Sequence, residues 1–204
     1  MDRLYWSPDS ANLAVRLVLH ELDLPYEAIL VDRGRAAHKS ADYLALNPRG
    51  LLPVLIASDQ NAPLFETAAI LLYLADREGR LGASRPAARG RLLKWLFFIS
   101  NTLHADLRLR FYAERYLADE GGAPALRQGV RTRIEGHLRL LDQAIGESGG
   151  PWLLGETLSV CDPYLACCVR WAQLYPPDDT VAAEDVRTLP ALVRLLEAAA
   201  ARPA

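Results

Sequence analysis

Two short segments of the sequence carry residues that could bind a small polar ligand. In residues 47–55, Pro53 follows a turn that contains glycine and enters an apolar stretch. If the peptide bond before Pro53 is cis, the amide and carbonyl of Leu52 are free to pair with a peptide-like ligand; a trans proline at the start of a strand is the alternative. Glu66 and Thr67 stand where a helical pattern begins, and the hydroxyl and amides there could bind a carboxylate. A plain helix cap explains the same pair.

These segments belong to a part of the chain in which strand-like and helix-like patterns alternate. The apolar spacing of Leu13, Leu17 and Leu24, for example, is that of one helix face. The patterns predict strands over residues 3–6, 26–31, 53–57 and 64–65, and helices over residues 11–24, 41–46 and 66–78. Alternating elements give a sheet with helices on its faces, so we expect a small α/β sandwich.

The rest of the chain shows helical patterns only. Residues 77–89 contain Gly79, Gly82, Ser84 and Pro86, which is typical of a linker. Beyond them, the spacing predicts long helices over residues 87–117, 125–145, 160–174 and 188–200. We therefore expect an α/β domain over residues 1–80 and an all-α domain over residues 86–204.

Ser159 and Asp162 form a capping-box pattern at the start of the third of these long helices. In such a box, each side chain accepts a hydrogen bond from the backbone amide of the other residue. Asp replaces the more usual Glu or Gln. We expect this pair to support the folding of a buried helix and to take no part in a reaction.

The composition excludes several classes of protein. The 204 residues include 23 Lys and Arg and 25 Asp and Glu, a formal net charge of −2 at pH 7, which disfavours a basic nucleic-acid binder. Hydrophobic residues make up 51% of the chain, so its bulk is not disordered. The longest apolar run, residues 68–75, is far shorter than the ~20 residues that a membrane span needs, and the first residues lead into no secretory segment. We expect a cytoplasmic protein.

Cysteine and histidine usage limits the chemistry further. The three cysteines, Cys161, Cys167 and Cys168, all occur late, and an odd count with two adjacent residues does not make a disulfide framework. We expect them to be small buried hydrophobes. Any thiol chemistry in the first 160 residues must therefore use a thiol from another molecule. The four histidines show no metal-ligand spacing, so we predict no metal.

Taken together, the Pro53 turn, the Glu66-Thr67 pair and the Ser159 to Asp162 box, in this order and spacing, resemble the cytosolic glutathione transferase family over nearly the whole chain. The resemblance implies a thioredoxin-like first domain, an all-helical second domain, glutathione as co-substrate and a homodimer. It also implies a second site, lined largely by the helical domain, for a small hydrophobic electrophile whose conjugation would serve detoxification.

The resemblance assigns glutathione-binding roles to particular residues. The Leu52 backbone, before Pro53, would pair with the cysteinyl part of glutathione. Glu66 and Thr67 would hold the γ-glutamyl end. A basic residue before the second helix should meet the glycyl carboxylate; we take Arg35 for this role, with Arg33, His38 and Lys39 as its competitors.

The residue that activates the thiol is expected between the first strand and the first helix. The Pro-x-Ser-Ala pattern of the serine-dependent classes is matched by residues 8–11, which makes Ser10 the first choice. A hydroxyl hydrogen bond and the positive end of a helix can lower a thiol pKa from near 8.5. Asn12 and Ser7 remain alternatives, and Ser10 could merely cap the helix. Ala11 stands where the β-class keeps a cysteine. Asp9 would raise the thiol pKa unless its side chain points away.

In the helical domain, the resemblance suggests His104 and Tyr112 as residues of the second-substrate site, although a histidine satisfied within its helix and a core aromatic are the more common explanations of such residues. Three functions follow. The first is conjugation of the glutathione thiolate to an electrophile. The second is glutathione-dependent reduction of a disulfide or a peroxide. The third is a non-catalytic interaction module of the same fold, against which the intact Glu66 and Thr67 argue.

Overall fold

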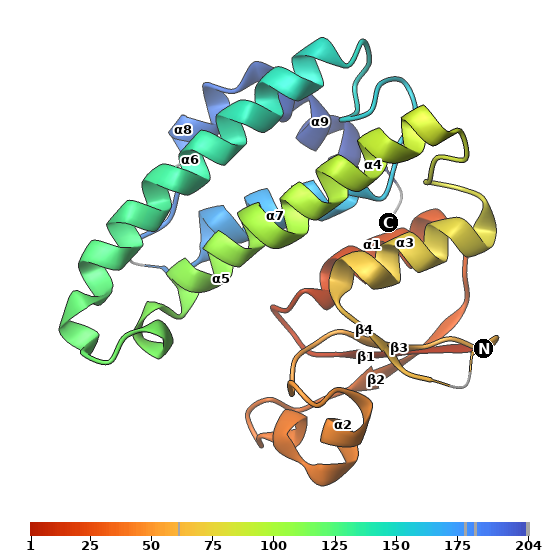
Figure 1. The fold of residues 1–204 in the computed structure, drawn as a ribbon, viewed down its shortest axis with the longest axis vertical. Helices are drawn as coiled ribbons and strands as arrows, with labels where there is room; N and C mark the ends of the chain where they lie inside the picture. Colours follow the sequence, from red (N-terminus) through yellow and green to blue (C-terminus); the bar gives the residue numbers. More distant parts are fainter. Residues whose placement is uncertain (61, 178, 182, 203–204) are drawn as a thin grey trace. The chain divides into compact units, whose positions relative to one another are not determined.

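A computed structural model describes residues 1–60, 62–177, 179–181 and 183–202. The chain divides into two compact units: Met1–Gly82 and a second unit that begins at Ala83 (Figure 1). Residues 178, 182, 203 and 204 of the predicted helical domain, 86–204, lie outside the described residues.

The first unit is built on a four-stranded sheet of order β2-β1-β3-β4. Its strands are β1 (Asp2–Trp6), β2 (Tyr26–Leu30), β3 (Val54–Ile56) and β4 (Leu64–Phe65). The pair β1 and β2 is parallel, whereas β3 runs antiparallel to both β1 and β4. Each predicted strand is present, with its ends within one residue of the prediction.

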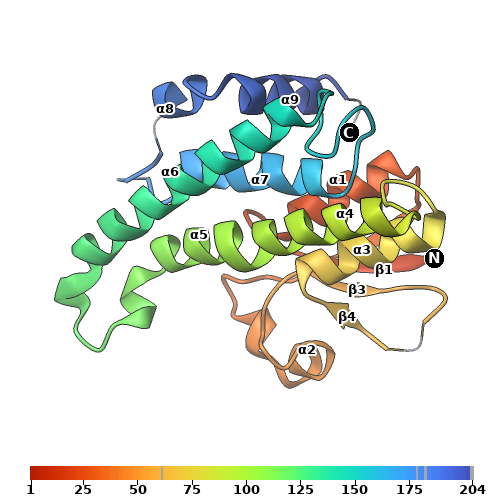
Figure 2. The same cartoon turned by 45° about the horizontal axis from the view of Figure 1, so that its top comes forward.

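Three helices flank this sheet: α1 (Asn12–Glu21), α2 (Ala41–Leu46) and α3 (Thr67–Glu78). Figures 1 and 2 show α1 and α3 side by side on one face and α2 on the other. Apolar side chains that are fully buried fill the space between the sheet and α1 and α3, among them Leu4, Val15, Leu19, Ile70 and Leu74. Tyr43 of α2 packs with Val31 and Val54 on the other face. This is the thioredoxin-like arrangement that the resemblance implies.

The described part of the second unit is built from helices: α4 (Pro86–Phe98), α5 (His104–Phe111), α6 (Ala123–Glu147), α7 (Cys161–Leu174), α8 (Ala183–Arg187) and α9 (Pro190–Ala200). The longest, α6, buries Val130, Ile134, Leu138, Leu141 and Ile145, spaced by three or four residues along one face. The predicted helices 125–145 and 160–174 are present.

The prediction of one continuous α-helix over residues 87–117 is wrong. A π-helical segment, Ile99–Leu103, separates α4 from α5, and the His104 amide donates to the Ile99 carbonyl five residues back. Its Ser and Asn side chains compete for backbone hydrogen bonds, and its β-branched residues crowd the preceding turn, so a regular α-helix is less favoured here. At Tyr112 the backbone leaves the helical region (φ −125°, ψ 38°), which ends α5 before a 3₁₀ turn, Ala113–Tyr116.

Of the two hydrogen bonds predicted for the capping box at α7, one is present. The fully buried Asp162 carboxylate accepts from the Ser159 amide at 2.7 Å, as predicted, and also from the Ser159 hydroxyl at 2.9 Å and the Leu153 amide at 2.8 Å. The Ser159 hydroxyl, however, accepts from the Cys161 amide at 3.3 Å, because the Asp162 amide bonds the Ser159 carbonyl instead. Burial outweighs these hydrogen bonds and raises the pKa of Asp162 to about 6. The pair therefore ties the loop before α7 to the helix start.

Cys161, Cys167 and Cys168 are free thiols buried in α7, as expected for small hydrophobes, and burial raises the pKa of each. Within the described ranges, none of the helices combines the length and the apolar character that crossing a bilayer requires. The same part of the chain contains no group of three His, Cys, Asp or Glu residues arranged to hold a metal ion.

Candidate functional site

The register of the sheet brings the predicted glutathione-binding segments to one end of the first unit. Tyr5, next to the last residue of β1, pairs with Val54 at the start of β3, and Val54 pairs with Phe65 at the end of β4. The loops that follow Trp6 and Phe65 and the loop that precedes Val54 therefore meet at the same edge. These loops contain Ser10, the Leu52–Pro53 bond and the start of α3.

The turn between β1 and α1 is held together by its own polar side chains. Asn12 is 3% exposed, and its Oδ1 accepts from the Ser7 amide at 3.2 Å. Ser10 is half-buried; its hydroxyl donates to the Ser7 carbonyl at 3.1 Å and also contacts Asn12 Oδ1. Ser7 is buried, and no side-chain hydrogen bond caps α1. Of the three predicted thiol-activating candidates, Ser10 is thus the one whose side chain is accessible. Asp9, with a left-handed φ of 51°, is exposed.

The Leu52–Pro53 peptide bond is cis, which is the first of the two alternatives for this proline. The loop before it is fixed from α2: the Tyr43 hydroxyl and the Asn47 side-chain amide both donate to the Leu51 carbonyl at 2.8 Å. Among the turn and loop hydrogen bonds of the described residues, none uses the amide or carbonyl of Leu52. The Leu52 main chain is therefore free to pair with a peptide-like ligand.

Gly50 closes the same loop in a conformation that favours glycine. Its φ is +61°, and a Cβ at this position would lie 2.9 Å from the backbone carbonyl oxygen of His38. A side chain here would force the loop away from the segment before α2. Glycine thus allows the close approach that sets the path of the chain into Leu52.

The start of α3 provides backbone amides to the same end of the sheet. Glu66 precedes the helix with φ 72°, and no side-chain hydrogen bond caps the helix. The first amides of an α-helix have no partner within the helix and carry the positive end of its dipole, so they attract an anion. Thr67 is buried, whereas the Glu66 side chain is exposed and pairs with Arg49 at 2.9 Å. A left-handed backbone at a non-glycine residue costs about 1–3 kcal/mol and is commonly found at functional sites.

Arg35, the predicted partner of the glycyl carboxylate, is held elsewhere. Its Nε lies 3.5 Å from the Asp32 carboxylate, its amide donates to Asp32 Oδ1 at 3.1 Å, and its side chain is 89% exposed. Its competitors Arg33 and Lys39 are also exposed. The structure thus brings Ser10, Leu52, Pro53, Glu66 and Thr67 to one edge but leaves the basic residue open.

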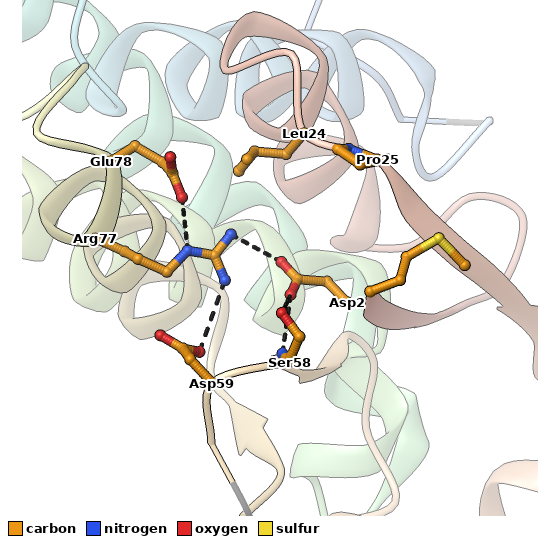
Figure 3. Close-up of a pocket in the computed structure, with 8 residues that line it drawn as sticks. Asp2, Leu24, Pro25, Ser58, Asp59, Arg77 and Glu78 are labelled. Carbon is orange, nitrogen blue, oxygen red and sulfur yellow. Dashed lines mark hydrogen bonds and ion pairs between the residues drawn. The ribbon is translucent and has the colours of Figure 1, made fainter.

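A hollow of about 280 Å³ lies at the opposite end of the sheet, where β1 begins (Figure 3). Its centre is Arg77, which pairs with Asp2 at 2.8 Å and Glu78 at 2.7 Å and lies 3.8 Å from Asp59. Burial alone would raise the pKa of Asp2, but hydrogen bonds from Arg77 and Ser58 hold this pKa below its ordinary value. The charged groups of this hollow are engaged with one another and fasten the end of α3 to β1.

In the second unit, His104 is surrounded by aromatic rings of α7. Its Nδ1 lies 2.7 Å from the Tyr164 hydroxyl, and its ring centre lies 5.1 Å from that of Trp171. Burial, reinforced by the charge of Arg108, lowers the pKa of His104 to about 4. The imidazole is therefore neutral near pH 7 and satisfied within its own unit. Tyr112 is half-buried at the end of α5, where Arg115 stacks on its ring.

Comparison with known proteins agrees with both units. Sequence profiles described as the glutathione S-transferase N-terminal and C-terminal domains match residues 12–77 and 108–201. Glutathione S-transferase GST-4.5 of Xanthomonas campestris pv. campestris is 34% identical over 173 residues, which are 83% of this chain and 82% of that protein. The chain belongs to the glutathione S-transferase family.

Two further proteins similar to this transferase differ in the activity for which they are named. The disulfide-bond oxidoreductase YfcG of Escherichia coli (strain K12) is 28% identical over 206 residues, 98% of this chain and 91% of that protein. A glutathione transferase homologue from Sulfitobacter, crystallised with bound glutathione, superposes with a TM-score of 0.84 at 26% identity, covering 99% of this chain and 93% of that chain. The family identifies the chain as a transferase, so the non-catalytic module is not favoured.

Sequence reasoning missed several residues that shape the site of this transferase. Arg49 pairs with Glu66, and Tyr43 and Asn47 fix the loop before Leu52. Asn47 and Arg49 lie within residues 47–55, the segment that predicts the Pro53 turn, so their place in the sequence could have indicated their role. Tyr43 carried none, because its hydroxyl meets Leu51 only through the fold.

The neutral state of His104 predicts a pH dependence of stability. Its folded pKa of about 4 lies below the ordinary 6.5, so its contribution is complete above pH 6.5 and is lost as the pH falls through about 4. The ring keeps some exposure to water, which reduces the effect of the pKa shift. We therefore expect His104 to contribute about 2 kcal/mol to the change in the free energy of unfolding between these pH values. Denaturant unfolding of wild type and His104→Gln at a series of pH values should give curves that converge in acid. Parallel curves would contradict the prediction.

Proposed function

We propose that this protein binds glutathione at the edge of the sheet where the Ser7 to Asn12 turn, the Leu52–Pro53 bond and the start of α3 meet. The observation that carries the proposal is this convergence, which follows from the strand register. A tripeptide with two carboxylates needs both main-chain partners and an anion site. The free Leu52 main chain and the uncapped amides of α3 supply them.

Each part of glutathione has a matching group in this arrangement. The cysteinyl backbone pairs with the Leu52 amide and carbonyl. The γ-glutamyl carboxylate lies at the amides of Thr67 and Ala68, and its ammonium group meets the Glu66 carboxylate. For the glycyl carboxylate we keep Arg35 as the candidate, since its side chain is exposed and can leave Asp32 for about 1 kcal/mol or less.

The chemical step requires a thiolate. The Ser10 hydroxyl, next to the positive end of α1, turns from the Ser7 carbonyl to donate a hydrogen bond to the glutathione sulfur, while Asn12 keeps the turn in place. The thiolate attacks the electrophilic carbon of a small hydrophobic second substrate. A carbon–sulfur bond forms, the leaving group departs with the bonding electron pair, and the thiol proton has already gone to solvent. His104 and Tyr112 belong to the second-substrate site of the helical unit.

Disulfide reduction is the second candidate function. One observation favours it: the relative in Escherichia coli is named a disulfide-bond oxidoreductase. Since all three cysteines of this chain are buried in α7, the exchange would use glutathione thiols only. The thiolate of bound glutathione would then attack sulfur instead of carbon, and a second glutathione would complete the exchange. Turnover of a model disulfide that exceeds conjugation of a halo-aromatic substrate would favour this candidate.

We also propose that the protein is a cytoplasmic homodimer. Phe97 on α4 is 52% exposed, and aromatic residues are enriched at protein–protein interfaces, so we place Phe97 in the contact between the two copies. Sedimentation of the purified protein at micromolar concentration measures this directly, and a monomer would contradict the proposal.

The glutathione site predicts a specific loss of affinity in Glu66→Gln. The substitution removes the negative charge that faces the γ-glutamyl ammonium group, and a hydrogen bond to a charged group contributes about 1.5–3 kcal/mol. We expect the Kd for glutathione to rise at least about tenfold. Calorimetric titration measures it, with Glu27→Gln, an exposed carboxylate on β2, as the matched control. No binding of millimolar glutathione by the wild type would refute the proposed function.

A further inference from the structure

Two arginines converge on one tyrosine ring where α5 ends. The Arg115 guanidinium carbon lies 4.2 Å from the centre of the Tyr112 ring, and that of Arg108 lies 5.6 Å from it. The turn after α5 causes this approach: the Tyr112 amide donates to the Arg108 carbonyl, and the Arg115 amide donates to the Tyr112 carbonyl at 2.8 Å. Arg108 Nε also donates to the Tyr116 hydroxyl at 3.1 Å. We call Arg108, Tyr112 and Arg115 the arginine pair site.

Neither of these two arginines has a carboxylate partner among the described residues, in contrast to four arginines of α5 and α6. Within the described part of the chain, neither Arg108 nor Arg115 has an Asp or Glu oxygen within ion-pair distance. Glu114, between them in the sequence, pairs with Arg127. The four arginines with such a partner are Arg110 with Asp179, Arg127 with Glu114, Arg131 with Glu135, and Arg133 with Asp106. The arginine pair site therefore carries two uncompensated positive charges.

The charges lie close enough to act together. Since both approach one ring centre, they are no further apart than about 10 Å, which is the Debye length at 0.1 M salt. Arg108 and Tyr112 are half-buried, so screening there is weaker than on an open surface. An oxyanion bound between the guanidinium groups would relieve their repulsion, and the planar fork of arginine suits a carboxylate.

The site lies on the helix face that contains the second-substrate residues. His104, Arg108 and Tyr112 are spaced by four residues and therefore share one face of α5. His104 is neutral and bonded to Tyr164, so it supplies no negative charge to this face. The positive charge of this face is that of Arg108, and Arg115 of the following turn stacks on Tyr112 beside it.

We infer that the arginine pair site binds a carboxylate of the second substrate, so that the preferred electrophile of this transferase is an organic anion. The inference rests on the proposed function, which supplies the thiolate. The carboxylate is unchanged in the reaction: the carbon–sulfur bond forms and the leaving group departs elsewhere on the molecule.

Two aryl chlorides of matched shape test the charge preference. Chlorodinitrobenzoate carries a carboxylate where chlorodinitrobenzamide carries a neutral amide. With wild type, we expect the KM for the benzoate to be about tenfold lower than the KM for the benzamide. In Arg108→Gln the KM for the benzoate should rise about tenfold, and in the more exposed Arg115→Gln about threefold, with the benzamide constants unchanged. Arg108→Lys should retain most of the preference.

One variant serves as the control. Arg139→Gln removes an exposed charge of α6 outside the site and should keep the wild-type preference for the benzoate. Equal KM values for the two substrates in wild type, or equal effects of Arg108→Gln on both, would overturn the inference. So would a rise in the KM for glutathione in place of the benzoate.

Failure of conjugation and failure of this inference give different results. If glutathione binds but neither aryl chloride reacts, the proposed function fails, and binding is then measured with unreactive dinitrobenzoate and dinitrobenzamide by tryptophan fluorescence of the glutathione complex. Tighter binding of the benzoate that Arg108→Gln abolishes supports the arginine pair site. Equal binding of the two compounds overturns it.

Discussion

Replacement of Ser10 by alanine should lower kcat/KM for conjugation by about tenfold to a hundredfold near neutral pH. A hydrogen bond to a charged group is worth about 1.5–3 kcal/mol. The bond that the Ser10 hydroxyl donates would be stronger to the thiolate than to the thiol, so it would stabilise the reactive form. Without it, the pKa of bound glutathione should rise by about 1 to 2 units. The thiolate absorbance of the binary complex, recorded against pH, measures this shift.

The same variant separates activation from binding. Ser10 contacts the turn and not the anion site at α3, so the Kd for glutathione should change by less than about threefold in Ser10→Ala. Activity should recover partly as the pH is raised toward the new thiol pKa. Ser10→Thr keeps a hydroxyl, and Ser84→Ala removes an exposed hydroxyl in the linker; both should stay close to wild type. An unchanged thiol pKa in Ser10→Ala would assign activation to Ser7 or Asn12.

Asp162→Ala should reduce the free energy of unfolding by about 4 kcal/mol. The substitution leaves the buried amides of Ser159 and Leu153 without an acceptor, and each unsatisfied group costs about 1–3 kcal/mol. The Ser159 hydroxyl loses its acceptor as well. Denaturant titration followed by circular dichroism gives the difference.

The chain contains a matched comparison for this variant. Asp142 on α6 also accepts from two backbone amides, those of Ala191 and Leu192 at 2.8 and 2.9 Å, but it is only half-buried. Because water can replace the lost acceptor there, Asp142→Ala should cost about 1 to 2 kcal/mol. Equal losses for the two variants would mean that burial does not determine the role of Asp162.

Elements whose cause is local could be predicted from the sequence. The strands and the helices of the first unit follow from short apolar patterns bounded by turn residues, and the mixed sheet with helices follows from their alternation. The approach of Asp162 to the Ser159 amide is local as well, since the two residues are three positions apart in the sequence. The Leu153 amide that completes the contact is nine residues away, and only the folded loop brings it to the carboxylate.

Features that depend on distant partners could not be predicted. The break at Ile99–Leu103 is a small difference between two helix types, and no single residue there is a strong helix breaker. The pairing of Arg49 with Glu66 joins residues 17 positions apart. Glu114 lies next to Arg115 in the sequence but pairs with Arg127, and only the folded structure shows this. Among 21 arginines, the sequence offered no way to tell which two would share one tyrosine ring without a carboxylate partner.

The π-helical segment between α4 and α5 also bears on how this chain can change its length. Each residue of an α-helix turns the chain by about 100°, so loss of one residue from Ile99–Leu103 would rotate everything that follows by more than a quarter of a circle. His104, Arg108 and Tyr112 would exchange places with side chains that now face other directions, such as the buried Leu107 and Arg110. Insertion or deletion of a single residue should therefore be tolerated in the loops between helices but not in Ile99–Leu103. The number of residues in this segment determines which side chains of α5 share a face with His104.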